Sequence, residues 1–233
     1  MEDIDFTTSE LSESGGDYIL EVNADTTLRS MGNYAVNLSY KDRDNITITL
    51  KGMGGRRNIS TTHLVGGLFI VGSGITFIID DNIIFQGVPT GRPIDNLTSV
   101  VRVGSGGTSI MNEGSGIVGN MSFQNGGGVS VSSGGIFLMN GGFIAGNTCF
   151  QPQDQALVMA TEGEANTFSE RSRRGGGVYV DVGGTFTKTG GTITGYANDP
   201  EGGNVTKSFN GLSVSHKYLL LWEPLVEVYL QVQ

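Results

Sequence analysis

Residues 126–146 read GGGVSVSSGGIFLMNGGFIAG, and 49 residues further along, residues 175–195 read GGGVYVDVGGTFTKTGGTITG. Both stretches share the order of their glycine turns and short apolar runs, and not only their composition. A shared order at a fixed offset is typical of repeat proteins, in which each copy forms one unit that stacks on the next.

Weaker copies precede these two. Residues 101–112 match the copy at Val129 with an offset of 28, residues 69–80 precede them by 32, and residues 47–50 precede those by 29. The offset of 49 exceeds an ordinary period by about 21 residues, which the glycine-poor segment 148–174 supplies as an inserted loop. We therefore expect about five rungs or more, above the roughly three that a repeat array needs.

Short alternating apolar runs bounded by Gly, Ser or Asn indicate strands within each copy. In the clearest copy we expect strands at 129–131, 136–139 and 143–145, joined by turns whose positive φ angles glycine adopts without strain. The sequence thus predicts an all-β fold, a single-stranded right-handed parallel β-helix (β-solenoid) with rungs of about thirty residues.

Equivalent residues of successive rungs should stack in columns, because the strands lie parallel and in register. The largest apolar side chains fall in columns that we expect inside the coil: Ile48, Phe77, Ser109, Phe137 and Phe186; Leu50, Ile79, Met111, Met139 and Lys188; Val101, Val129 and Val178; Val103, Val131 and Val180; Phe85, Ile117, Ile144 and Ile193. Lys188 departs from its column, and we expect it to snorkel outward where the core ends. Asp80, Asn112 and Asn140 predict a polar corner ladder that caps turn backbone groups.

The repeat divides one domain into three parts. Residues 1–45 are expected to form an N-terminal cap and the first rung, and residues 46–211 the β-helix with its inserted loop at 148–174. Residues 212–233 contain no glycine and match no repeat. This tail either caps the open end of the solenoid or is an aberrant end.

Two regions are candidates for ligand binding. The outward positions between the first two interior columns carry Thr47, Thr49, Thr76, Thr108, Thr185 and Thr187 together with an apolar group. That group is Ile78, Ile110, Ile136 and Leu138, and we expect the tail, the loop, another protomer or a partner to cover it. If inside and outside were exchanged, the Phe and Met columns would take this role. The inserted loop adds the polar candidates Gln151, Asp154, Glu162, Glu164, Arg171 and Arg173.

Composition excludes several functions. A net charge of −9 argues against a nucleic-acid partner, because few cations are present to replace phosphate counterions. One cysteine and two histidines allow neither a disulfide framework nor a His-rich metal site, and we expect no cofactor. The acidic turns 42–44 and 80–82 lack the ligand spacing of a calcium loop. Residues 218–230 are apolar but interrupted by Glu223, Pro224 and Glu227, so we expect no membrane span.

Residues 1–10 are acidic and do not resemble a signal peptide. Six Asn-x-Ser/Thr sequons are present, a number that this composition produces without any function. No residues show the pairing of carboxylates with a base that polysaccharide lyases and hydrolases use. The sequence therefore predicts no catalytic residues.

The copies at 126–146 and 175–195 resemble the glycine-rich repeats of bacterial surface proteins in the pectin-lyase-like right-handed β-helix superfamily, over residues 47–198. The resemblance implies an extracellular or cell-surface location and a noncatalytic, adhesin-like scaffold for a host protein, matrix component or polysaccharide. Alternatives are a polysaccharide lyase or hydrolase, and a structural stalk fragment that self-associates through its ends or its flat face. The threonine column also resembles that of ice-binding solenoids, although Ile136 interrupts it.

Overall fold

A computed structural model describes residues 15–28, 36–42, 44–61, 67–88, 98–151, 175–195, 202–208 and 213–214. Within these residues the regular structure is all β, and the strands form four sheets. Sheet A contains β1 (Gly16–Val22), β4 (Ile46–Gly52), β7 (Ile75–Ile79), β10 (Thr108–Met111), β14 (Ile136–Met139) and β18 (Thr185–Lys188). Sheet B contains β2 (Thr26–Leu28), β5 (Arg57–Thr61), β8 (Ile83–Gln86), β11 (Gly116–Val118), β15 (Phe143–Ala145) and β19 (Thr192–Ile193).

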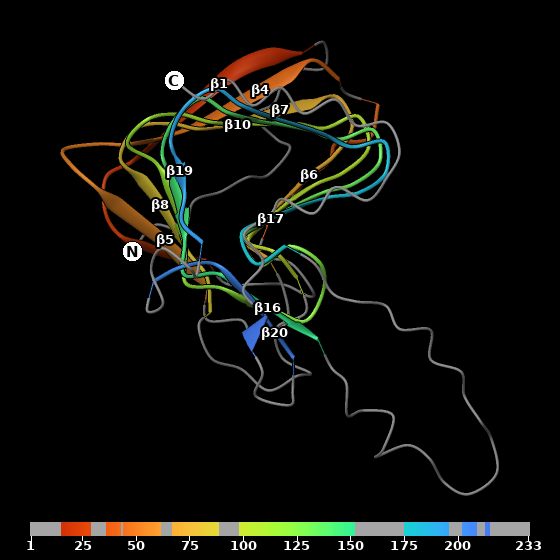
Figure 1. Cartoon of the computed structure of the whole chain (residues 1–233). Helices are drawn as coiled ribbons and strands as arrows, with labels where there is room; N and C mark the ends of the chain where they lie inside the picture. Colours follow the sequence, from red (N-terminus) through yellow and green to blue (C-terminus); the bar gives the residue numbers. More distant parts are fainter. Residues whose placement is uncertain are drawn as a thin grey trace, which may run out of the picture.

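Two further sheets complete the coil. Sheet C contains β3 (Val36–Leu38), β6 (Phe69–Val71), β9 (Val101–Val103), β13 (Val129–Val131) and β17 (Val178–Val180). Sheet D contains β12 (Met121–Ser122), β16 (Thr148–Gln151), β20 (Val205–Ser208) and β21 (Ser213–Val214). Figure 1 looks along the stack, with sheet A at the top, sheet B at the left, sheet C at the right and β16 and β20 below.

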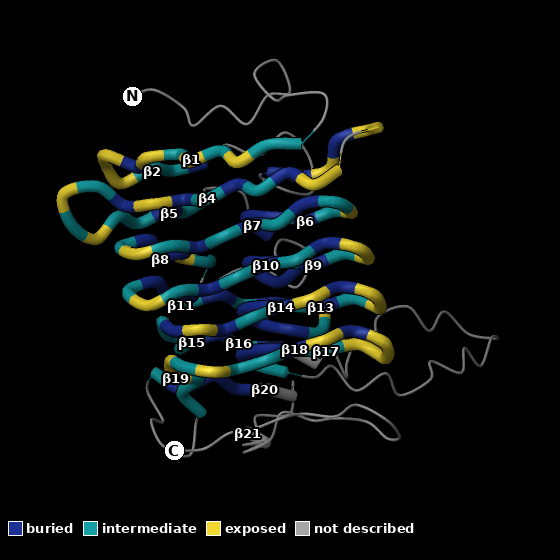
Figure 2. The backbone as a smooth tube through the Cα atoms, turned by 90° about the horizontal axis from the view of Figure 1, so that it is seen from above, coloured by how far each residue is buried: buried dark blue, intermediate teal, exposed yellow. Residues whose placement is uncertain are grey.

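The protein is a parallel β-solenoid, as the repeat predicted. Neighbouring strands of sheets A, B and C pair in parallel across successive rungs, which Figure 2 shows as layers running from β1 to β19. The register follows the sequence offsets, because Val129 pairs with Val101 and Val178, and Ile48 pairs with Phe77. The three strands expected in the clearest copy are β13, β14 and β15, with the predicted bounds.

Glycine turns join sheet C to sheet A. Gly74, Gly106, Gly134 and Gly183 have φ angles of 73°, 71°, 74° and 80°, which favour glycine. The turns stack as the strands do, since the amide of Gly106 donates to the carbonyl oxygen of Gly134 at 2.9 Å and that of Gly134 donates to Gly183 at 2.8 Å. The turn backbone is therefore hydrogen-bonded along the stack and continues the ladder of the strands.

The predicted interior columns form the core. In the first column the side chains from Ile48 to Phe186 are buried, and in the second those from Leu50 to Met139 are buried. Lys188, on the outermost strand of sheet A, is half-buried. Val180 and Ile193, at the same end, are partly buried. The core is thus continuous through the stack and thins at its C-terminal end.

Two asparagine ladders run along the stack. At the predicted corner, Asn112 donates to Asp80 at 2.9 Å and Asn140 donates to Asn112 at 3.4 Å, so these side chains bond to one another along the stack. The second ladder, which was not predicted, consists of the buried Asn120, Asn147 and Asn204. Two of the six sequons therefore begin at buried asparagines, which a glycosyltransferase cannot reach in the folded protein.

Ser109 occupies a column that is otherwise aromatic or aliphatic. It pairs with Phe77 on one side and Phe137 on the other, and its fully buried hydroxyl has no hydrogen-bond partner in the described structure. Burying an unpaired hydroxyl costs free energy that alanine does not incur. We expect Ser109→Ala to raise the free energy of unfolding by about 1 kcal/mol in urea titrations. An unchanged or lower stability would show that the hydroxyl is satisfied in solution.

Candidate functional site

The outer face of sheet A carries the candidate site. Its first column runs Asp17, Thr47, Thr76, Thr108, Ile136 and Thr185, and its second runs Ile19, Thr49, Ile78, Ile110, Leu138 and Thr187. The alternation of each strand places these side chains outside, because the residues between them are the interior columns. The face is the top layer in Figure 1.

The structure brings together the four apolar residues predicted on this face. Ile110 pairs with Ile78 on one side and with Leu138 on the other, so the three are consecutive in one column. Ile136 lies beside Leu138 in the neighbouring column and is 38% exposed, whereas the other three are half-buried by their neighbours. The prediction that the patch faces outward agrees with the fold.

Sequence reasoning missed the N-terminal extension of this face. β1 pairs with β4 over its full length and adds Asp17 and Ile19, of which Ile19 is 68% exposed. The alternation in DYILEV at 17–22 was the available signal. The glycine turn at Gly15 and Gly16, with Gly15 at a φ of 84°, precedes this run as in the copies at 126–146 and 175–195, but no second glycine turn follows Val22 as it does there.

The centre of the face carries no charged side chain. The outward positions of β7, β10 and β14 hold only threonine, isoleucine and leucine. Interior side chains with almost no exposure lie directly beneath them. Such a surface offers methyl groups and hydroxyls for contact, so it favours dispersion and neutral hydrogen bonds over ion pairing.

The predicted loop candidates lie mostly outside the described residues. Asp154, Glu162, Glu164, Arg171 and Arg173 fall in the part of the chain that the structure does not describe. Gln151 ends β16, where its backbone pairs with Ser208. The loop boundary at 148 was wrong, because residues 148–151 form a strand between β12 and β20.

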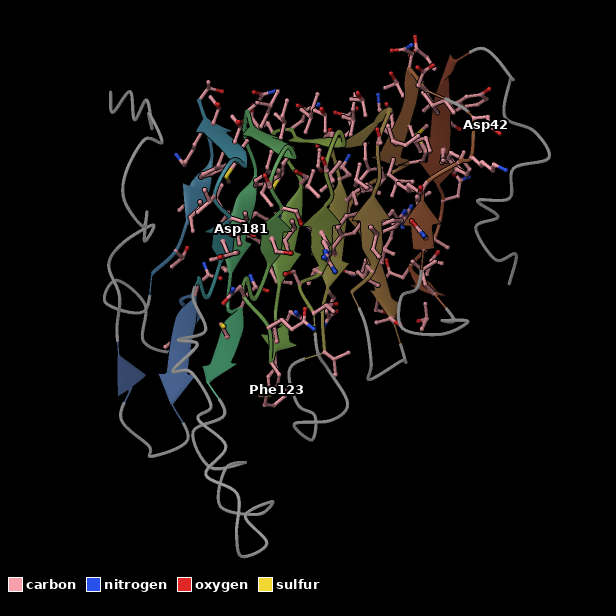
Figure 3. The ribbon with its side chains drawn as sticks, turned by 90° about the vertical axis from the view of Figure 1, so that its right-hand side faces the viewer. Asp42, Phe123 and Asp181 are labelled. Atoms are coloured by element: carbon pink, nitrogen blue, oxygen red, sulfur yellow. The ribbon has the colours of Figure 1, made fainter. Side chains whose placement is uncertain are left out.

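Polar groups elsewhere have structural partners. Asp25 accepts the backbone amide of Asn58 at 2.9 Å and its side-chain amide at 3.2 Å. These hydrogen bonds, the backbone one first, lower the pKa of the Asp25 carboxyl below its ordinary value. The hydroxyl of Tyr179, on β17, donates to Asp181 in the turn that follows this strand. Figure 3 labels Asp181 on the side of sheet C.

The acidic turns at 42–44 and 80–82 gather no metal site in the described part of the chain. There, no group of three or more His, Cys, Asp or Glu side chains is placed to hold a metal ion. Asp80 instead accepts a hydrogen bond from Asn112. Asp42, labelled in Figure 3, lies apart from it toward the N-terminal end of the stack.

Comparison of this chain with known proteins identifies no relative. The described residues include no helix of the length and apolar character needed to cross a membrane. No protein-family model, no curated protein and no solved structure matches this chain.

Proposed function

We propose that this chain is a noncatalytic, adhesin-like binding scaffold, secreted or displayed on a bacterial cell surface, within the pectin-lyase-like β-helix superfamily. Its outer face of sheet A contacts a host protein, a matrix component or a polysaccharide. The observation that carries the proposal is the in-register Thr and Ile array with Ile136 exposed on it. Contiguous exposed apolar groups on an otherwise polar protein mark interaction surfaces.

The scaffold suits this role because the face is organised before binding. In sheet A, each of the strands β4, β7, β10 and β14 is paired on both edges, and the residues below them are buried. A partner that docks there orders few side chains, and β-branched residues have little rotamer freedom to lose. Little of the contact energy is therefore spent on ordering the protein.

The size of the face sets the strength of binding. Six strands about 4.8 Å apart, with about four residues each, span about 24 Å by 13 Å. That is about 300 Å², less than half of the roughly 800 Å² that each partner contributes to a standard interface. One copy should therefore bind weakly, and many copies on one surface should bind through avidity, which supports surface display.

A charge on this face should weaken binding. Ile110→Lys places an ammonium group at the centre of the uncharged array, and we expect it to weaken binding to any ligand found on a glycan and matrix-protein array at least about tenfold. Binding by immobilised, multivalent chains would be measured by surface plasmon resonance. Gln86→Lys, on the exposed outer side of sheet B, adds the same charge and should leave binding unchanged. Equal losses in both variants, or none in Ile110→Lys, would contradict the proposed surface.

A further inference from the structure

The two ends of the solenoid are strand edges of the same kind. β1 and β2 are the outermost strands of sheets A and B at one end, and β18 and β19 are outermost at the other. The backbone groups on such an edge form a template for another strand. In Figure 2, β1 and β2 form the first described layer, and at the other end β20 and the short β21 of sheet D lie beyond β18 and β19.

The repeat makes the two edges complementary. Tyr18 and Phe186 belong to one interior column, since Tyr18 pairs with Ile48 and Phe186 pairs with Phe137. If β1 of a second copy paired with β18 in the same register, Tyr18 of that copy would stack on Phe186 and extend the column by one residue. Likewise Thr26, which pairs with Ile59, would follow Ile193 in sheet B.

Lys188 interrupts this complementarity. It pairs with Met139 in the column that begins with Leu20 and Leu50, and it is half-buried at the end of that column. A strand stacked on β18 would remove its ammonium group from water. β1 points its acids, Asp17 and Glu21, to the outer side, so the side chain that meets Lys188 inside would be Leu20. An unpaired buried charge is strongly unfavourable.

We propose that the ends of this solenoid are matching docking surfaces for a second copy of the chain, and that Lys188, at an inward position of the edge strand β18, holds them apart. Inward-pointing charges on edge strands are a known protection against edge-to-edge association. Sheet C begins at β3, in the rung of β4, and has no described strand level with β1, so sheets A and B form the joint. A heterologous contact of this kind repeats without closing and produces rods.

The test replaces Lys188 by residues that its own column contains. Lys188→Met and Lys188→Leu should keep the fold, checked by circular dichroism, and should tighten self-association of the full chain at least about 100-fold. Analytical ultracentrifugation over a concentration series measures the change, and negative-stain electron microscopy should show rods. Lys51→Met, which removes the same charge from an exposed position on β4, should leave the chain monomeric.

A second substitution locates the joint. Adding Leu20→Lys to Lys188→Met restores a charge at the opposite edge and should return the protein to monomers. Three results would each overturn the proposal: wild-type chains that form rods as readily as Lys188→Met, a folded Lys188→Met that stays monomeric, or rods that survive Leu20→Lys. A monomeric Lys188→Met would show that another part of the chain occupies the end.

Discussion

Replacing Asn147 by leucine should lower the free energy of unfolding by about 4 kcal/mol, the cost of several buried polar groups left without partners. The Asn147 side-chain amide donates to the carbonyl oxygens of Ile117 and Ala145, both at 3.0 Å, and its Oδ1 accepts the backbone amide of Asn120 at 3.1 Å. It also donates to Oδ1 of Asn204 at 2.9 Å. Leucine has a similar size but satisfies none of these groups.

Urea unfolding monitored by circular dichroism measures this loss, with the m value checked for two-state behaviour. Asn140→Leu is the matched control, because Asn140 belongs to the exposed corner ladder, where water can replace its hydrogen bonds at 3.4 and 3.2 Å. It should cost less than about 1 kcal/mol. Similar losses in the two variants would mean that burial does not determine the strength of these ladders.

The parts of the fold that could be predicted are those with a dense and regular signal. Glycine turns fix where strands end, and an alternating run between two turns has one face that must be buried. These constraints predicted β13, β14 and β15 with their bounds, and they placed Ser109 correctly inside despite its polarity. Position in the repeat was a better guide there than residue type.

The repeat gave only part of the buried asparagine ladder, because Asn120 and Asn147 match at an offset of 27 but the third member is displaced. Asn147 directly follows the glycine that ends its copy, but the equivalent Asn204 comes nine residues after Gly195. The intervening residues break the alignment, and Gly195 and Asn204 meet as a bridge in the structure. β16 was also missed, although residues 147–151 (NTCFQ) match residues 120–124 (NMSFQ) at an offset of 27.

The candidate site was predicted as a binding surface, but its partner was not. Alternation alone placed Ile78, Ile110, Ile136 and Leu138 on one face, and the register of β7, β10 and β14 shows them adjacent. The partner is not predictable from them, because apolar contacts carry little directional information. Specific recognition needs polar groups in fixed positions, and on this face those are the threonine hydroxyls.

The aromatic cluster in the interior should be the other position of large effect. Phe69 of sheet C lies 4.8 Å from Phe77 of sheet A and 4.9 Å from Phe85 of sheet B, measured between ring centroids, and all three are fully buried. Phe69→Ala removes the ring that contacts both Phe77 and Phe85 and leaves a cavity between sheets A, B and C. We therefore expect the free energy of unfolding to fall by about 4 kcal/mol in urea titrations.

Phe143 supplies the matched control, because it is half-buried on the outer side of sheet B. Its ring lies against Gly116, and Cζ of Arg56 lies over the ring, 5.9 Å from the ring centroid. Phe143→Ala removes the same atoms from a position that solvent can fill, so it should cost about 1 kcal/mol. The difference between the two variants then measures how far the three sheets depend on a shared core. If Phe69→Ala cost no more than Phe143→Ala, the strand ladders alone would hold the solenoid, and the columns would serve to set its register.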